Sequence, residues 1–167
     1  MTMDGVAQEV ATYERAIRRM RPAIEVGDIE PWPYFSGATL AQWIAAFRAA
    51  AGHDFQFFHV DVDYGAATKL GGDWSDLQEL AALCRSRGIR FGVIVWQSNV
   101  LDAASSDETF YRNAMAFATR MSALDLGEDD VIVQSWDQWP KVSVPDSAGF
   151  TFTQLVRDYA ERFSLVR

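Results

Sequence analysis

The sequence has few of the residues that disulfides, zinc centres and nucleic-acid surfaces require. Cys84 is the one cysteine, so no internal disulfide is possible, and it lies in an apolar helical pattern. Its two histidines form no zinc-spaced cluster, and no Ser-His-Asp order suggests a hydrolase triad. No glycine-rich phosphate loop follows an apolar run. The net charge of −8 argues against nucleic acid and against an anionic membrane surface as partners.

Long apolar runs are also absent. No stretch approaches the roughly 20 apolar residues that a membrane-spanning helix needs. We therefore expect no membrane partner and a soluble protein, for which the single cysteine favours the cytoplasm. Nearly half of the 167 residues are apolar, which is enough for one domain, 1–167, with a real core.

The order of apolar patterns predicts an α/β fold. Spacings of three and four predict helices, and continuous apolar runs predict strands buried on both faces. The helices are expected over 4–20, 36–52, 73–88, 105–124 and 151–163, and the strands over 23–30, 55–64, 89–97 and 130–136. A helix followed by four βα units (23–163) implies a parallel sheet with right-handed crossovers. Two architectures fit this order: an open doubly wound sheet, or half of a TIM-type (βα)₈ barrel.

Carboxylates gather at the ends of the first two predicted strands, where parallel α/β proteins bind ligands. Side chains alternate along a strand, so Asp28 and Glu30 share one face, and His59, Asp61 and Asp63 share another. We expect the second group to lie on the interior side. If the two strands are neighbours, Glu30 and Asp61 or Asp63 converge at one rim, and the pKa of one carboxyl group is raised.

Glu30, Asp61 and Asp63 are therefore the candidate catalytic residues. Each has a structural alternative. Glu30 is otherwise a surface carboxylate at a turn, although Pro31 and Pro33 fix the backbone behind it. Asp61 or Asp63 otherwise caps or braces the loop that follows the strand.

Amide and aromatic side chains at the same strand ends suit a polyol ligand. Glutamine orients hydroxyl groups, and an indole face stacks on the C–H face of a sugar ring. The candidate substrate-binding residues are Trp32, His59, Gln97, Gln134, Trp136 and Trp139. For His59 the alternative is a hydrogen-bonded interior histidine, and for the last two tryptophans it is packing beneath the 137–150 loop.

The segments "VGDIEPWPYF", "FFHVDVDY", "GIRFGVIVWQ" and "DVIVQSWDQWPKVSVPDSAGFTFTQLVRDY" together resemble the C-terminal half of a (βα)₈-barrel glycoside hydrolase of the clan-A type. The resemblance implies hydrolysis of an O-glycosyl bond, with an acid/base glutamate at a strand end, often before proline. Glu30-Pro31 matches this motif, although Ile29 stands where the clan usually has asparagine. The later strand ends hold Gln97 and Gln134 in place of a nucleophilic glutamate, so Asp61 or Asp63 becomes the second carboxylate.

Two further functional hypotheses remain open. Hard cations take oxygen ligands, so Mg²⁺, Mn²⁺ or Ca²⁺ at Asp28, Glu30, Asp61 and Asp63 is one alternative to an enzyme without a cofactor. The other is a non-catalytic, glycan-binding or structural barrel fragment. In every case a complete barrel has eight strands and this chain predicts four. Because open sheet edges promote association, we expect a homo-oligomer or a second barrel half as partner, besides a carbohydrate or other polyol ligand.

Overall fold

The computed structural model describes residues 2–96, 105–136 and 138–163. In these residues four strands are combined with six α-helices and one short 3₁₀ helix. The elements in chain order are α1 (Met3–Met20), β1 (Asp28–Trp32), α2 (Gly37–Ala51), β2 (Phe57–Val62), α3 (Tyr64–Leu70), α4 (Ser75–Arg87), β3 (Arg90–Val95), α5 (Asp107–Ser122), β4 (Asp130–Val133), η1 (Asp146–Ala148) and α6 (Phe152–Phe163). The predicted order of long helices and strands is confirmed.

Two local predictions are wrong. The first strand begins at Asp28, five residues later than predicted, because residues 22–23 form a turn and residues 24–27 belong to no strand. None of the predicted helices covers 64–72, yet this stretch contains α3. The carboxylate of Asp63 accepts a hydrogen bond from the backbone N–H of Ala66, 2.9 Å away, and so caps the start of this helix.

Local sequence signals account for the ends of the other helices. The Ser36 hydroxyl accepts from the Thr39 N–H at the start of α2. Gly52 and Gly88 follow α2 and α4 with φ angles of 85° and 70°. A residue with a Cβ adopts this left-handed conformation only at a cost, so glycine ends these helices cleanly.

The four strands form one all-parallel sheet in the order β1-β2-β3-β4. Trp32 pairs with Val62, and Val60 pairs with Val93 on the next strand. Each strand thus lies beside the next one in sequence, as expected when every crossover contains a helix and has the same hand.

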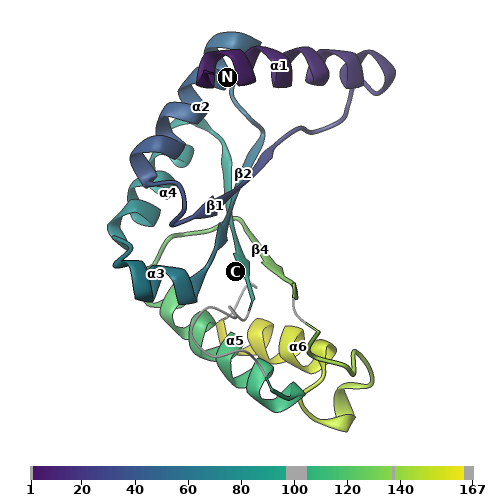
Figure 1. Ribbon diagram of the computed structural model, residues 1–167. Helices are drawn as coiled ribbons and strands as arrows, with labels where there is room; N and C mark the ends of the chain where they lie inside the picture. Colours follow the sequence, from purple (N-terminus) through teal and green to yellow (C-terminus); the bar gives the residue numbers. More distant parts are fainter. Residues whose placement is uncertain (1, 97–104, 137, 164–167) are drawn as a thin grey trace.

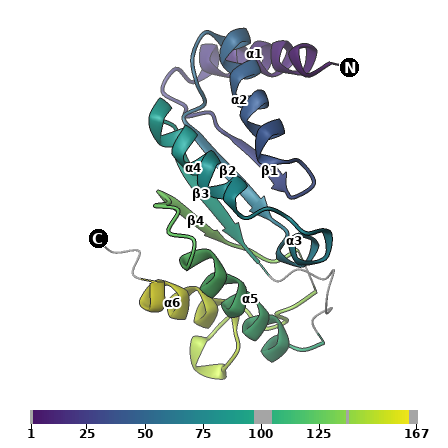
Figure 2. The ribbon, with the colours of Figure 1, turned by 90° about the vertical axis from the view of Figure 1, so that its left-hand side faces the viewer.

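The helices cover one face of this sheet. Figure 1 shows α2, α4 and α5 along one side of the strands, and Figure 2 shows the same helices in front of the sheet. α1 packs on α2, and α6 packs on α5. The molecule is therefore curved, with helices outside and the other face of the sheet turned toward the hollow side.

The hydrophobic core lies between the sheet and the helices. On β2, burial alternates strictly: Phe58, Val60 and Val62 are fully buried and contact the helices, and the residues between them are half-buried. Burying each such side chain is worth about 1.5–3 kcal/mol. In the described part of the chain, no helix is long and apolar enough to cross a membrane.

Candidate functional site

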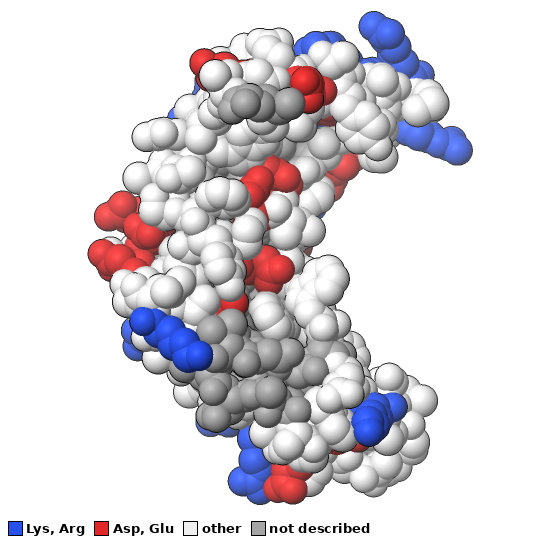
Figure 3. All heavy atoms as spheres, viewed as in Figure 1, with Lys and Arg blue, Asp and Glu red and all other residues white. Residues whose placement is uncertain are grey.

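One face of the sheet is covered by no helix of the described residues, and we call it the uncovered face (Figure 1). It carries the first group of candidate residues. Phe57, His59 and Asp61 alternate with the core residues of β2 and therefore point away from the helices. This agrees with the face predicted for His59 and Asp61. Figure 3 shows Asp and Glu side chains along the hollowed side of the molecule.

Asp61 lies at the centre of a hydrogen-bonded group at the carboxyl ends of three neighbouring strands. The indole Nε1 of Trp96, which follows β3, donates to Asp61 Oδ1 at 2.8 Å. The indole of Trp136, which follows β4, also donates to the Asp61 carboxylate. The Trp136 side chain itself is 71% exposed. A carboxylate is thus held between two indoles, and one of these keeps its ring accessible to solvent.

The pKa of Asp61 is raised above its ordinary value. Burial is the largest cause, and the nearby charge of Asp63 adds to it. The two indole hydrogen bonds act in the opposite direction because they stabilise the charged form. Asp61 is therefore a carboxyl group whose proton affinity depends on the donors around it.

Asp63 has a structural role in this group. It is buried, with one oxygen accepting from the Tyr34 hydroxyl at 2.7 Å and the other from the Ala66 N–H at 2.9 Å. The alternative considered from the sequence, a carboxylate that braces the following segment, describes these contacts. Asp63 holds α3 and the β1–α2 loop next to Asp61.

Glu30 does not meet Asp61, and the expected convergence at one rim is wrong. In the β1–β2 pairing, Glu30 lies beside Val60, and Asp61 lies beside Pro31. Paired residues in a parallel sheet point to the same face, so Glu30 shares the face of Val60, toward the helices. Asp61 points to the opposite face.

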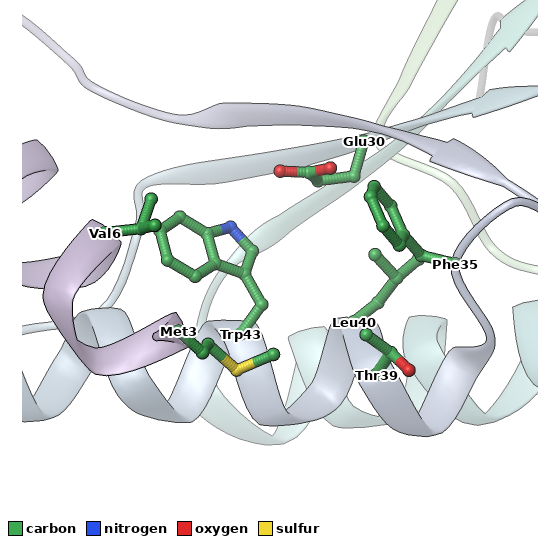
Figure 4. A pocket seen from close by; sticks show the side chains of 7 residues that line it. All are labelled: Met3, Val6, Glu30, Phe35, Thr39, Leu40 and Trp43. Atoms are coloured by element: carbon green, nitrogen blue, oxygen red, sulfur yellow. The ribbon is translucent and has the colours of Figure 1, made fainter. Parts of the chain in front are cut away.

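Glu30 instead lies over an apolar pocket of about 210 Å³ between β1, α1 and α2. Figure 4 shows its carboxyl group above the pocket, with Trp43 and Leu40 below it. The pocket is lined by Met3, Val6, Glu30, Phe35, Thr39, Leu40 and Trp43.

Asp28 and Glu30 form a hydrogen-bonded acid pair at this pocket. Burial and the neighbouring charge of Asp28 raise the pKa of Glu30 to about 7. Burial also raises the pKa of Asp28, whose Oδ2 accepts from the Trp43 indole. A raised pKa at Glu30 agrees with the prediction from the sequence. The acid that raises it is Asp28, and the predicted partner was Asp61 or Asp63.

The four carboxylates that were considered as cation ligands are also divided between the two faces of the sheet. Asp28 and Glu30 lie on the covered face, and Asp61 and the end of β2 lie on the other. Among the described residues, no group of three or more His, Cys, Asp or Glu side chains is arranged to hold a metal ion.

The remaining candidate residues have separate environments. His59 bonds to Asp130 at 3.1 Å over Gly92, as expected for an interior histidine. Trp32 was expected at the ligand site, but it is a fully buried core residue whose indole donates to Asp76, because it shares the helix-facing side of β1.

Gln134 is half-buried near the end of β4, and its Nε2 has no hydrogen-bond partner among the described residues. Trp139 packs against the Phe110 cluster, with Lys141 over its ring. This is the packing alternative considered for it. Gln97 lies outside the described residues.

Two contributors were not among the predicted site residues, Trp96 and Tyr34. The sequence does not show which face of the sheet the alternate residues of the third strand point to, because both sets contain apolar side chains. The sequence offers one hint, Gly92, because a glycine inside a strand often marks a close contact. The structure shows that contact: a Cβ at Gly92 would lie 2.5 Å from the His59 ring, so Gly92 and Trp96 lie on the uncovered face. No comparable hint marks Tyr34.

No family model, curated protein or solved structure matches the chain. The resemblance to clan-A glycoside hydrolases therefore stays a prediction from the quoted motifs.

Proposed function

We propose that the chain binds a carbohydrate on the uncovered face of the sheet, at Asp61 and Trp136. The observation that carries this proposal is the Asp61 carboxylate held by the indoles of Trp96 and Trp136 at the ends of adjacent strands. Ligands of parallel α/β folds bind at these ends.

The chemistry of the group suits a sugar. A carboxylate accepts hydrogen bonds from hydroxyl groups, and the exposed ring of Trp136 offers an apolar face for C–H groups. The carboxylate and the exposed ring together suit ligands that have both hydroxyl groups and an apolar face.

The geometry supports binding more strongly than hydrolysis. Retaining glycosidases need two carboxyl groups about 5–5.5 Å apart, and inverting ones about 6.5–9.5 Å. Glu30 points to the opposite face, and both Asp63 oxygens already accept hydrogen bonds from Tyr34 and Ala66. Asp61 therefore lacks an available second carboxylate among the described residues, and we expect binding without turnover.

The proposed architecture is half of a (βα)₈ barrel. The sequential parallel order supports it, as does the placement of the described helices on one face of the sheet (Figure 1). A full barrel has eight strands, and β1 and β4 are edge strands of the described sheet. We propose that a second half covers these edges, contributed by another copy of the chain or by another segment. Light scattering tests self-association, and a monomer that unfolds cooperatively would contradict it.

Calorimetric titration with a panel of neutral mono- and oligosaccharides tests the binding proposal. We expect saturable binding, weakened about tenfold by Trp136→Ala because the stacking surface is lost. Asp61→Asn is expected to weaken it similarly, since a charged acceptor is replaced. Tyr13→Ala is the matched control, because Tyr13 is a comparably exposed aromatic on α1. The proposal fails if no sugar binds, or if Trp136→Ala binds as the wild type does.

The same panel, offered as chromogenic glycosides, separates binding from catalysis. We expect no turnover. Turnover that is lost in Asp61→Asn would instead make the chain a hydrolase with Asp61 as a catalytic residue.

A further inference from the structure

The pocket beneath Glu30 is separate from the proposed carbohydrate site, because it lies on the other face of the sheet. Its walls are apolar, with Met3 and Val6 from α1 and Leu40 from α2. The Glu30 carboxyl group projects over the opening, and the rings of Trp43 and Phe35 flank it (Figure 4). The pocket therefore combines an apolar cavity, two aromatic rings and one carboxyl group.

We propose that this pocket binds a small organic cation, an ammonium group carrying an apolar substituent, with Glu30 as its counter-ion. The apolar substituent occupies the cavity between α1 and α2, and the ammonium group lies between the Glu30 carboxylate and the aromatic rings.

Charge complementarity is the first argument for this ligand. Asp28 and Glu30 are adjacent carboxyl groups, and within the described residues neither has a Lys, Arg or His partner within ion-pair distance. Asp28 already accepts from the Trp43 indole and from the Ile29 N–H. When Glu30 is ionised it no longer donates a hydrogen bond to Asp28, and a cation then relieves the repulsion between the two carboxylates.

The aromatic rings and the cavity select an organic cation over a metal ion. Calcium and magnesium take about six or more oxygen ligands, and the pocket offers few oxygens besides Glu30. An ammonium group is attracted to the faces of aromatic rings such as Trp43 and Phe35. At about 210 Å³, the cavity is smaller than the roughly 300–1,000 Å³ typical of drug-sized ligands. The substituent is therefore small.

Binding is expected to depend on pH in a defined direction. The elements packed around Glu30 present apolar side chains, the Thr39 hydroxyl and the Trp43 indole, and Asp28 is the titratable group that perturbs it. A cation binds the ionised form of Glu30, so its affinity rises as pH increases through about 7.

Calorimetric titration with 2-phenylethylammonium at pH 8 tests the proposal, with 2-phenylethanol as the neutral analogue. We expect saturable binding of the amine and at least about tenfold weaker binding of the alcohol. Glu30→Gln is expected to lose about tenfold in affinity for the amine, and lowering the pH to about 5.5 is expected to cause a similar loss in the wild type. The matched control is Glu79→Gln, which removes the same charge from an exposed position on α4.

Each of three results would overturn the proposal. They are no saturable heat from the amine, equal affinity for the amine and the alcohol, and an affinity that Glu30→Gln leaves unchanged. Glutamine is a neutral isostere of the protonated glutamate, so this variant is expected to fold, and circular dichroism confirms that before titration.

Discussion

The two faces of the sheet use the same residue types in different ways. On the uncovered face, Asp61 accepts hydrogen bonds from Trp96 and Trp136, and these donors favour its charged form. On the covered face, Glu30 faces apolar side chains and a second acid, Asp28, which both disfavour its charged form. The pKa is raised in both cases, with burial as the largest cause, and the indole donors only reduce the rise at Asp61.

The largest expected difference between the faces concerns packing. Phe58 and Phe57 are neighbours on β2, but Phe58 is fully buried toward the helices and Phe57 is half-buried on the uncovered face. Phe58→Ala is expected to lower the free energy of unfolding by about 3–5 kcal/mol, because it leaves a cavity in the core. Phe57→Ala is expected to cost about 1 kcal/mol. Urea denaturation measures both, and equal losses would contradict the assignment of the faces.

The next expected effect tests how closely the uncovered face is packed. Gly92→Ala places a Cβ 2.5 Å from the His59 ring and 3.0 Å from Asp130, so the ring must move. We expect a loss of about 1–3 kcal/mol in unfolding free energy. The double variant His59→Ala/Gly92→Ala is expected to lose less than the sum of the two single variants. Strict additivity would mean that the ring does not oppose the new methyl group.

A smaller effect concerns the pH dependence of stability at Glu30, on the covered face. The pKa of Glu30 is raised from an ordinary value of 4.5 to about 7, so the folded chain binds more protons than the unfolded chain between these values. The raised pKa therefore makes the free energy of unfolding fall as pH rises from about 4.5 through about 7, where Glu30 loses its proton in the folded state. Glu30→Gln is expected to stabilise the protein by about 1 kcal/mol at pH 8, after allowance for solvent screening, and by little near pH 4.

Urea midpoints across this pH range measure the effect, with Glu79→Gln as the matched control at an exposed site. A Glu30→Gln difference that does not change with pH would show that its carboxyl group has an ordinary pKa.

The smallest expected effect on stability is at the proposed ligand site. Trp136 is 71% exposed, so Trp136→Ala is expected to change the unfolding free energy by less than about 0.5 kcal/mol. Thermal unfolding measures this change. A large loss would mean that Trp136 supports the fold, and its effect on sugar binding would then no longer report a contact with the ligand.

Much of the fold could be predicted from the sequence because its signals are local. The apolar stripe of Leu40, Ile44 and Phe47 and the glycine at position 52 define α2 and its end. Alternation within β2 placed Phe58 and Asp61 on opposite faces. The helix α3 was missed because its seven residues have no apolar stripe and depend on a cap from Asp63 and on buried small residues.

The sequence by itself determined the order of the elements, the parallel sheet and the two groups of carboxylates near strand ends. Only the tertiary structure decided which groups meet. Alternation sorts residues within one strand, but the relation between two strands depends on their pairing, and a shift of one residue reverses every side chain. The pairing of Glu30 with Val60 turned Glu30 and Asp28 toward an apolar pocket on the covered face. The pairing of β2, β3 and β4 brought two indoles to Asp61 on the other face.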